Sequence, residues 1–284
     1  MAAKPPLRHE EVQRVLRLLQ PLSAERRIVL VGGQAVAFWM RFLQDKHPDL
    51  RLSQPLTSKD IDFEGSAQSV RRAAALLAGQ MRIASMDDHT PNTGIVLFTD
   101  ADGVRREIDF IDAPHGLNAR DVRDTAVQLL VPAPDGAPDV PIWVMHPERC
   151  MESRIVNAAD LGKTAPLAMR QLEASIACAQ AWSQFILDDP TLPLEQRVRA
   201  VLRLNERIFR KCLGDKRFRS VVLDHDMHPF RALLIDDARL PDHVRDRRYP
   251  QMCELLEQRL KRDRANRARA ERARAARAAR ASHR

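Results

Sequence analysis

Residues 29–33 read Val-Leu-Val-Gly-Gly, and residues 57–63 read Thr-Ser-Lys-Asp-Ile-Asp-Phe. The first stretch is typical of a strand that ends at a glycine turn, and residues 34–43 continue it as a helix. The second stretch predicts another strand, on which Asp60 and Asp62 point to one face because side chains alternate along a strand. Together they predict an α+β fold with polar groups next to a glycine turn.

A third carboxylate, Asp109, lies in the later strand Ile-Asp-Phe-Ile at residues 108–111. Carboxylates held close together repel each other, and a bound cation relieves this repulsion; Mg²⁺ prefers oxygen ligands. The N–H groups of Gly32 and Gly33, with the N-terminus of the following helix, can face an anion such as a triphosphate. The ordered set therefore predicts a site for Mg²⁺ and a nucleoside triphosphate (NTP).

The same ordered set resembles the Pol β-like nucleotidyltransferase superfamily, whose members carry Gly-Gly or Gly-Ser, a helix, Asp-x-Asp and a later single Asp. Within the superfamily it is most similar to the AbiEii-like branch, which includes toxins of bacterial toxin–antitoxin pairs. The motifs cover roughly residues 27–112. The resemblance implies a Pol β-like core, formed by a mixed sheet with flanking helices and followed by a C-terminal helical bundle.

The resemblance also implies a role for each residue of the set. Asp60 and Asp62 would hold two Mg²⁺ ions against the nucleotide phosphates, while Asp109 would complete the second metal site and help to activate the attacking hydroxyl. Gly32 and Gly33 would bind the triphosphate through their backbone. The remaining residues expected to bind the nucleotide are Ser58, Lys59, Arg154 and Lys163.

On this basis we expect a Mg²⁺-dependent nucleotidyltransferase that moves a nucleotide from an NTP to an acceptor. The first expected acceptor is RNA, tRNA in particular, in a toxin-like role with an antitoxin protein as a partner. Two alternatives remain open: transfer to a small molecule, as in aminoglycoside nucleotidyltransferases, and a non-catalytic binding module. Leu56 stands where many relatives have an arginine, which favours the non-catalytic alternative.

The composition predicts a cytoplasmic protein without a membrane partner. The 284 residues contain no apolar run long enough to span a bilayer, and the N-terminus lacks the apolar stretch of a secretory signal. The four cysteines are far apart in sequence and form neither a zinc pattern nor an evident disulfide framework.

The sequence predicts a nucleotidyltransferase core at residues 1–145, a helical domain at 146–260 and an Arg/Ala-rich tail at 261–284. The tail contains ten basic and two acidic residues, so it accounts for the whole formal net charge of +8. We expect it to be an extended helix or disordered. Its charge fits contact with RNA, but it also fits a solvated helix end.

Periodicity gives a coarse order of elements. Helices are expected near residues 10–22, 67–80, 147–159, 167–187 and 194–212, with a last helix from Tyr249, and strands near residues 81–86, 94–99, 104–111, 126–131 and 141–145. Glu64 shares the predicted strand face of Asp60 and Asp62. It is expected to be either an outer group of the metal site or an exposed strand end.

Overall fold

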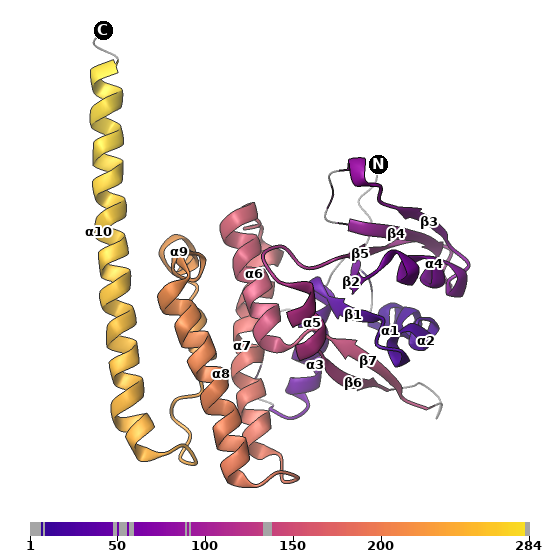
Figure 1. Ribbon diagram of the computed structural model, residues 1–284, viewed down its shortest axis with the longest axis horizontal. Helices are drawn as coiled ribbons and strands as arrows, with labels where there is room; N and C mark the ends of the chain where they lie inside the picture. The colour runs from indigo at the N-terminus through magenta and orange to yellow at the C-terminus, as the bar shows by residue number, and fades with distance from the viewer. Residues whose placement is uncertain are drawn as a thin grey trace. The chain divides into compact units, whose positions relative to one another are not determined.

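The computed structural model describes residues 7, 9–47, 50, 56, 60–88, 90, 92–132 and 138–281. Its strands form one seven-stranded sheet with the order β3-β4-β5-β2-β1-β7-β6 (Figure 1). The sheet is mixed because β2 pairs in parallel with β5 and antiparallel with β1. The strands are β1 (Ile28–Val31), β2 (Ile61–Gly65), β3 (Gln80–Ile83), β4 (Asn92–Thr99), β5 (Arg105–Ile111), β6 (Val127–Val131) and β7 (Val140–Val144).

Helices flank the sheet and follow it in sequence, so the α+β class predicted from the sequence is confirmed. The helices before β7 are α1 (His9–Leu18), α2 (Gln20–Ala24), α3 (Gly32–Gln44), α4 (Ala67–Leu76) and α5 (Ala119–Thr125). Those after β7 are α6 (Pro147–Leu161), α7 (Pro166–Asp188), α8 (Leu194–Gly214), α9 (Lys216–His225) and α10 (Tyr249–Ala281). Shorter helical turns are η1 (Met86–Asp88), η3 (Pro229–Ala232) and η4 (Val244–Arg248). None of the helices in the described ranges combines the length and apolar character needed to cross a membrane.

One face of the sheet is apolar and carries the core of the first part of the chain. Phe63 on β2 and Phe110 on β5 stack with ring centroids 5.7 Å apart, and both are buried. Helix α4 covers this face, and Ser69 Oγ on α4 donates a hydrogen bond to the carbonyl of Arg27, the residue before β1 (3.0 Å). Because side chains alternate, the residues between these aromatic rings point to the opposite face.

Helix α6 and most of α7 belong with the sheet. The indole N–H of Trp39 on α3 donates to the carbonyl of Met145 (2.7 Å), and its ring packs 5.1 Å from that of Trp182 on α7. The chain accordingly divides into two compact units, Met1–Trp182 and Ser183–Arg284. This division differs from the predicted boundary at residues 145 and 146, and the contact of Trp182 with the buried Trp39 ties α7 to α3.

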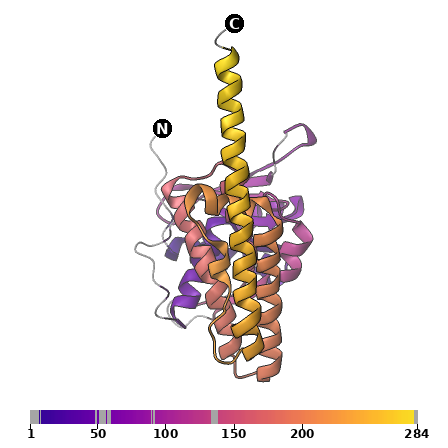
Figure 2. The ribbon, with the colours of Figure 1, turned by 90° about the vertical axis from the view of Figure 1, so that its left-hand side faces the viewer.

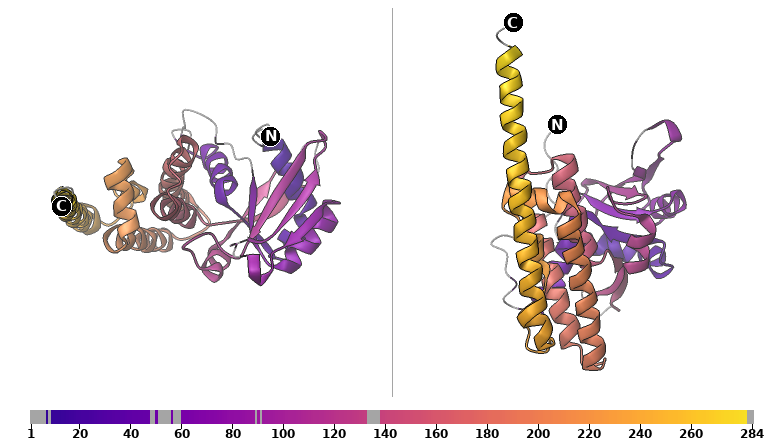
Figure 3. Two further views of the ribbon diagram at one scale, coloured as in Figure 1. Left: turned by 90° about the horizontal axis from the view of Figure 1, so that it is seen from above. Right: turned by 60° about the vertical axis from the view of Figure 1, so that its left-hand side comes forward.

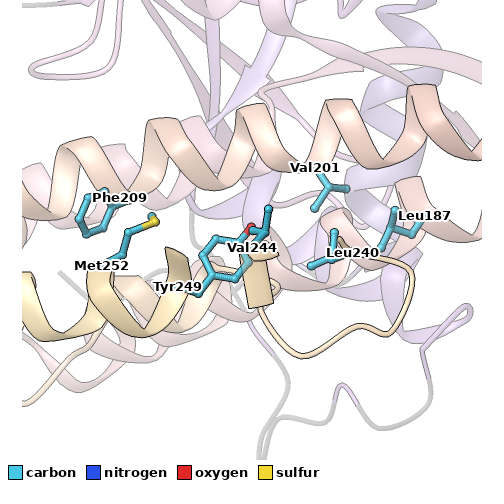
Figure 4. Packing of buried hydrophobic residues seen from close by; sticks show 7 residues of the cluster. All are labelled: Leu187, Val201, Phe209, Leu240, Val244, Tyr249 and Met252. Carbon is cyan, nitrogen blue, oxygen red and sulfur yellow. The ribbon is translucent and has the colours of Figure 1, made fainter. Parts of the chain in front are cut away.

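The second unit has a small apolar core of its own (Figure 4). Its buried members come from α7, α8, η4, α10 and the segment before η4: Leu187, Val201, Phe209, Leu240, Val244, Tyr249 and Met252. Asn205 on α8 donates from Nδ2 to the carbonyl of Leu234 (2.7 Å) and accepts from its N–H (3.2 Å). These bonds hold the irregular segment between α9 and α10 against α8.

Candidate functional site

Asp62 and Asp109 occupy paired positions on neighbouring strands. In the parallel ladder between β2 and β5, Asp62 is directly opposite Asp109, and Phe63 is opposite Phe110. Paired residues point to the same face, so the two carboxylates share the face opposite to the aromatic core. Both are partly buried. Asp60 lies just before β2 and is exposed.

The carboxyl of Asp62 is the electrostatic centre of this face. Its pKa is raised to about 6, first by burial and then by the negative charges of Asp109 and Asp60, while the positive charges of Arg154 and Lys163 oppose the rise. Of the residues predicted to form the site, these four therefore act on the Asp62 carboxyl. An additional positive charge at this position would favour the ionised form.

Gly32 brings the start of α3 against the same carboxylate. It has a φ of +69°, and a Cβ added there would overlap Oδ2 of Asp62 and lie 3.0 Å from its carboxylate carbon. Helix α3 begins without a side-chain hydrogen bond at its N-cap. The N–H groups of its first turn lie at a helix N-terminus beside Asp62, which is the kind of position at which proteins bind anions.

Gln171 on α7 is a residue that sequence reasoning missed. It is buried, with a relative exposure of 7%. Its Oε1 accepts a hydrogen bond from Nη1 of Arg154 (3.1 Å), and its Nε2 would lie 2.5 Å from a Cβ added to Gly33. Burial lowers the pKa of Arg154, and the nearby Asp62 opposes this change. Gln171 therefore connects the glycine turn with the cation that faces Asp62, and no motif in the sequence signals this connection.

Asn92 on β4 is a second missed residue. Its Nδ2 donates to Oδ1 of Asp109 (3.2 Å). A cavity of about 280 Å³ opens beside it on the same face, since its lining residues include Ile95, which is paired with Asp109, and Glu107 on β5. Its other polar lining residues are Arg82, Asp88 and Thr90. The carboxylates thus have the glycine turn on one side and a polar cavity on the other.

The remaining predicted residues fall into three cases. Ser58 and Lys59 lie outside the described residues. Lys163 is exposed and directly follows Gly162, the C-cap of α6. Glu64 is buried at 1% side-chain exposure and pairs with Nη2 of Arg123 on α5 (2.5 Å). The expectation of an exposed strand end was therefore wrong for Glu64, and the structure shows it paired with Arg123 of α5.

The donor set suits Mg²⁺ chemically, because it consists of carboxylate oxygens whose mutual repulsion a cation would relieve. In the structure the oxygens of Asp60, Asp62 and Asp109 are not all within 4.8 Å of one another, so rotation of these side chains would have to accompany a shared ion.

Within the described ranges, the group that does meet this distance is Glu11, Asp100 and Asp102. Arg106 already lies among these acids, with Nη2 3.0 Å from Glu11 and Nε 2.8 Å from Asp100. Arg106 is three residues before Asp109 on β5 and therefore points to the opposite face. We interpret this group as an ion-pair network in which Arg106 bridges Glu11 and Asp100, separate from the candidate site.

Comparison with known proteins identifies no family. No family model and no curated protein matches the chain. Among solved structures, the chain is similar to one titled "Crystal structure of JHP933 from Helicobacter pylori", with 14% identity and a TM-score of 0.34 over 93% of this chain and 99% of that chain. A similarity of this size supports no inference about function.

Proposed function

We propose that the chain is a Mg²⁺-dependent nucleotidyltransferase that transfers a nucleotide from an NTP to an acceptor. The observation that carries this proposal is the pairing of Asp62 with Asp109 on adjacent parallel strands, with the α-carbon of Gly32 against the Asp62 carboxylate. Two carboxylates beside a glycine-initiated helix N-terminus suit a metal-bound triphosphate.

Each group has a defined task in this proposal. Asp60, Asp62 and Asp109 would hold two Mg²⁺ ions, which when bound would neutralise charge on the attacking and leaving oxygens. The N–H groups of Gly32 and Gly33 would bind the phosphates. Arg154 and Lys163 would offset the negative charge of the triphosphate, as they already oppose the pKa rise of Asp62. Ser58 and Lys59 stay in the proposal as residues predicted from the sequence to bind the nucleotide.

The reaction forms one bond and breaks another at the α-phosphorus. An acceptor oxygen bonds to the α-phosphorus, the bond to the bridging oxygen breaks, and pyrophosphate leaves. A hydroxyl acceptor also loses its proton, and in this proposal the Asp109 carboxylate would assist this loss. The cavity beside Asn92 and Asp109 gives such an acceptor a polar approach on the side away from the glycine turn.

RNA, and tRNA in particular, is the proposed acceptor, in a toxin-like role in the cytoplasm with an antitoxin protein as partner. The basic segment at residues 261–284 supports this choice, because it would raise the local concentration of RNA. A small molecule of the aminoglycoside type remains the alternative acceptor, since Asp88 and Glu107 in the cavity suit amino and hydroxyl groups. A non-catalytic binding module is the alternative from another class.

The test is transfer of label from each of four α-labelled NTPs, with total RNA and an aminoglycoside mixture as separate acceptors. We expect label in RNA with Mg²⁺ and none with EDTA. If only the aminoglycosides became labelled, the proposed reaction would stand, but the acceptor would be a small molecule instead of RNA. NTP binding without transfer to either acceptor would favour the non-catalytic binding module. If the protein neither bound an NTP nor transferred label, the proposal would be refuted.

A further inference from the structure

Helix α10 has two parts that differ in their surroundings. Its first part packs in the second unit, where Tyr249, Met252, Leu256 and Leu260 are buried. Two ion pairs to α9 follow: Asp263 with Arg219, at 2.6 Å, and Arg267 with Asp224. These contacts hold α10 to α9 as far as Arg267.

The second part, residues 268–281, continues the same helix and is called the arm here. Figures 2 and 3 show α10, in yellow, running past α9 as one unbroken helix. From Ala268 to Ala278, where the side chains are described, every side chain is exposed. The arm contains only alanine and arginine besides Glu271. It is therefore a helix with positive charge and no large apolar side chain.

The arginines of the arm are distributed widely around the helix axis. At about 100° per residue, Arg269, Arg272, Arg274 and Arg277 cover an arc of about 200° over a length of about 12 Å. A flat partner would contact only a narrow stripe of such a helix. A membrane surface would in addition need an apolar face, which the arm lacks. A groove with phosphates on both walls can contact the whole arc.

We propose that the arm binds in the groove of a double-stranded nucleic acid and contacts the phosphates on both sides. The major groove of B-form DNA is about 12 Å wide and admits an α-helix, whereas regular A-form RNA needs a locally opened groove. The alanines between the arginines are small enough for close approach. This binding requires neither Mg²⁺ nor an NTP, so it stands or falls separately from the proposed enzyme activity.

The test is binding of the full chain to a fluorescent nucleic acid across a salt series, without Mg²⁺ or NTP. The probes are a duplex RNA containing an internal loop, a duplex DNA, a single strand of the same length, and anionic phosphatidylserine vesicles. The four arginines are replaced together by glutamine or by lysine; both residues favour helix, and only lysine keeps the charge. A third variant ends at residue 268 and retains both ion pairs to α9.

We expect the parent and the lysine variant to bind a duplex more tightly than the single strand. The glutamine variant should show a salt slope that is smaller by about 3 to 4, because each duplex phosphate contact contributes about 0.9 to the slope. The truncated variant lacks six arginines and should lose at least as much. Comparison of the affinities for the RNA duplex and the DNA duplex then shows which of the two nucleic acids is the partner. Unchanged affinity and slope in the glutamine variant, or a preference for single strands or vesicles, would overturn the proposal.

Discussion

The α-carbon of Gly32 lies against the carboxylate of Asp62, so that a Cβ at position 32 would occupy the place of Oδ2. The glycine turn and the first carboxylate strand are therefore in direct contact. The exchange of Gly32 for a larger residue changes the position of Asp62 as well as the backbone of the turn.

We expect Gly32→Ala to weaken NTP and Mg²⁺ binding at least tenfold and to destabilise the fold by about 1 to 2 kcal/mol, the cost of a left-handed conformation plus displacement of Asp62. Gly103→Ala is the matched control, since Gly103 also has a positive φ but no atoms near an added Cβ. Gly103→Ala should lose only the part of this stability that comes from the left-handed backbone, and it should keep full ligand binding. Titration calorimetry and urea unfolding measure both quantities, and equal ligand affinities in the two variants would contradict the prediction.

Asp109→Asn should reduce nucleotide transfer at least a hundredfold while leaving the thermal midpoint within a few degrees, because it removes ligand charge without removing packing. Asp124→Asn serves as the control, since Asp124 on α5 is exposed and pairs with Arg120 one turn away. Initial rates with saturating Mg²⁺ and NTP measure the effect. Full activity of the Asp109 variant would exclude this carboxylate from the metal site.

The raised pKa of Asp62 predicts a pH-dependent loss of stability in the absence of divalent cations. The pKa is about 6 in the folded state and 3.8 in the reference state, so between these values the folded protein binds more protons. Its free energy of unfolding should therefore fall as pH rises from about 4 to 6, by no more than about 3 kcal/mol. Asp62→Asn lacks this loss, so its stability relative to the parent should increase over that range and stay constant above it. Urea unfolding of both proteins in EDTA gives the difference, and a difference that is flat with pH would refute the assignment.

Removal of Arg106 should destabilise the protein by about 3 to 5 kcal/mol, because Arg106→Met removes the buried cation that pairs with the buried Glu11 and the largely buried Asp100. The triple change Glu11→Gln, Asp100→Asn and Arg106→Met should recover part of this loss. Arg105→Met is the control, since Arg105 is the exposed neighbour on β5. If the Arg106 and Arg105 variants unfold at the same urea concentration, the ion-pair network has no structural importance.

The sequence was sufficient to predict the strands that carry the carboxylates. Along β2, Ile61 and Phe63 alternate with Asp62, and the structure buries the two apolar residues at 1% exposure while Asp62 points to the other face. The same alternation applies to Asp109 on β5. Local patterns decide these features, so a single sequence contains them.

Contacts between distant elements could not be predicted in this way. Gln171 reaches the glycine turn from α7, and its sequence neighbourhood has no feature that distinguishes it from other polar helix residues. The burial of Glu64 was not predicted because its partner Arg123 is on α5, a seven-residue helix with one buried side chain and hence almost no apolar periodicity. The division of the chain within α7 likewise depends on the packing of Trp39 with Trp182.

The parallel pairing of β2 with β5 makes the candidate site dependent on correct strand alignment during folding. A slip of one residue between these strands would place Asp62 opposite a core residue such as Ile108 or Phe110, and the two carboxylates would then face opposite sides of the sheet. Such a slip would bury a charge and expose an aromatic ring. The apolar pattern that fills the core therefore destabilises the shifted register. Only molecules with the correct register bring the two acids together.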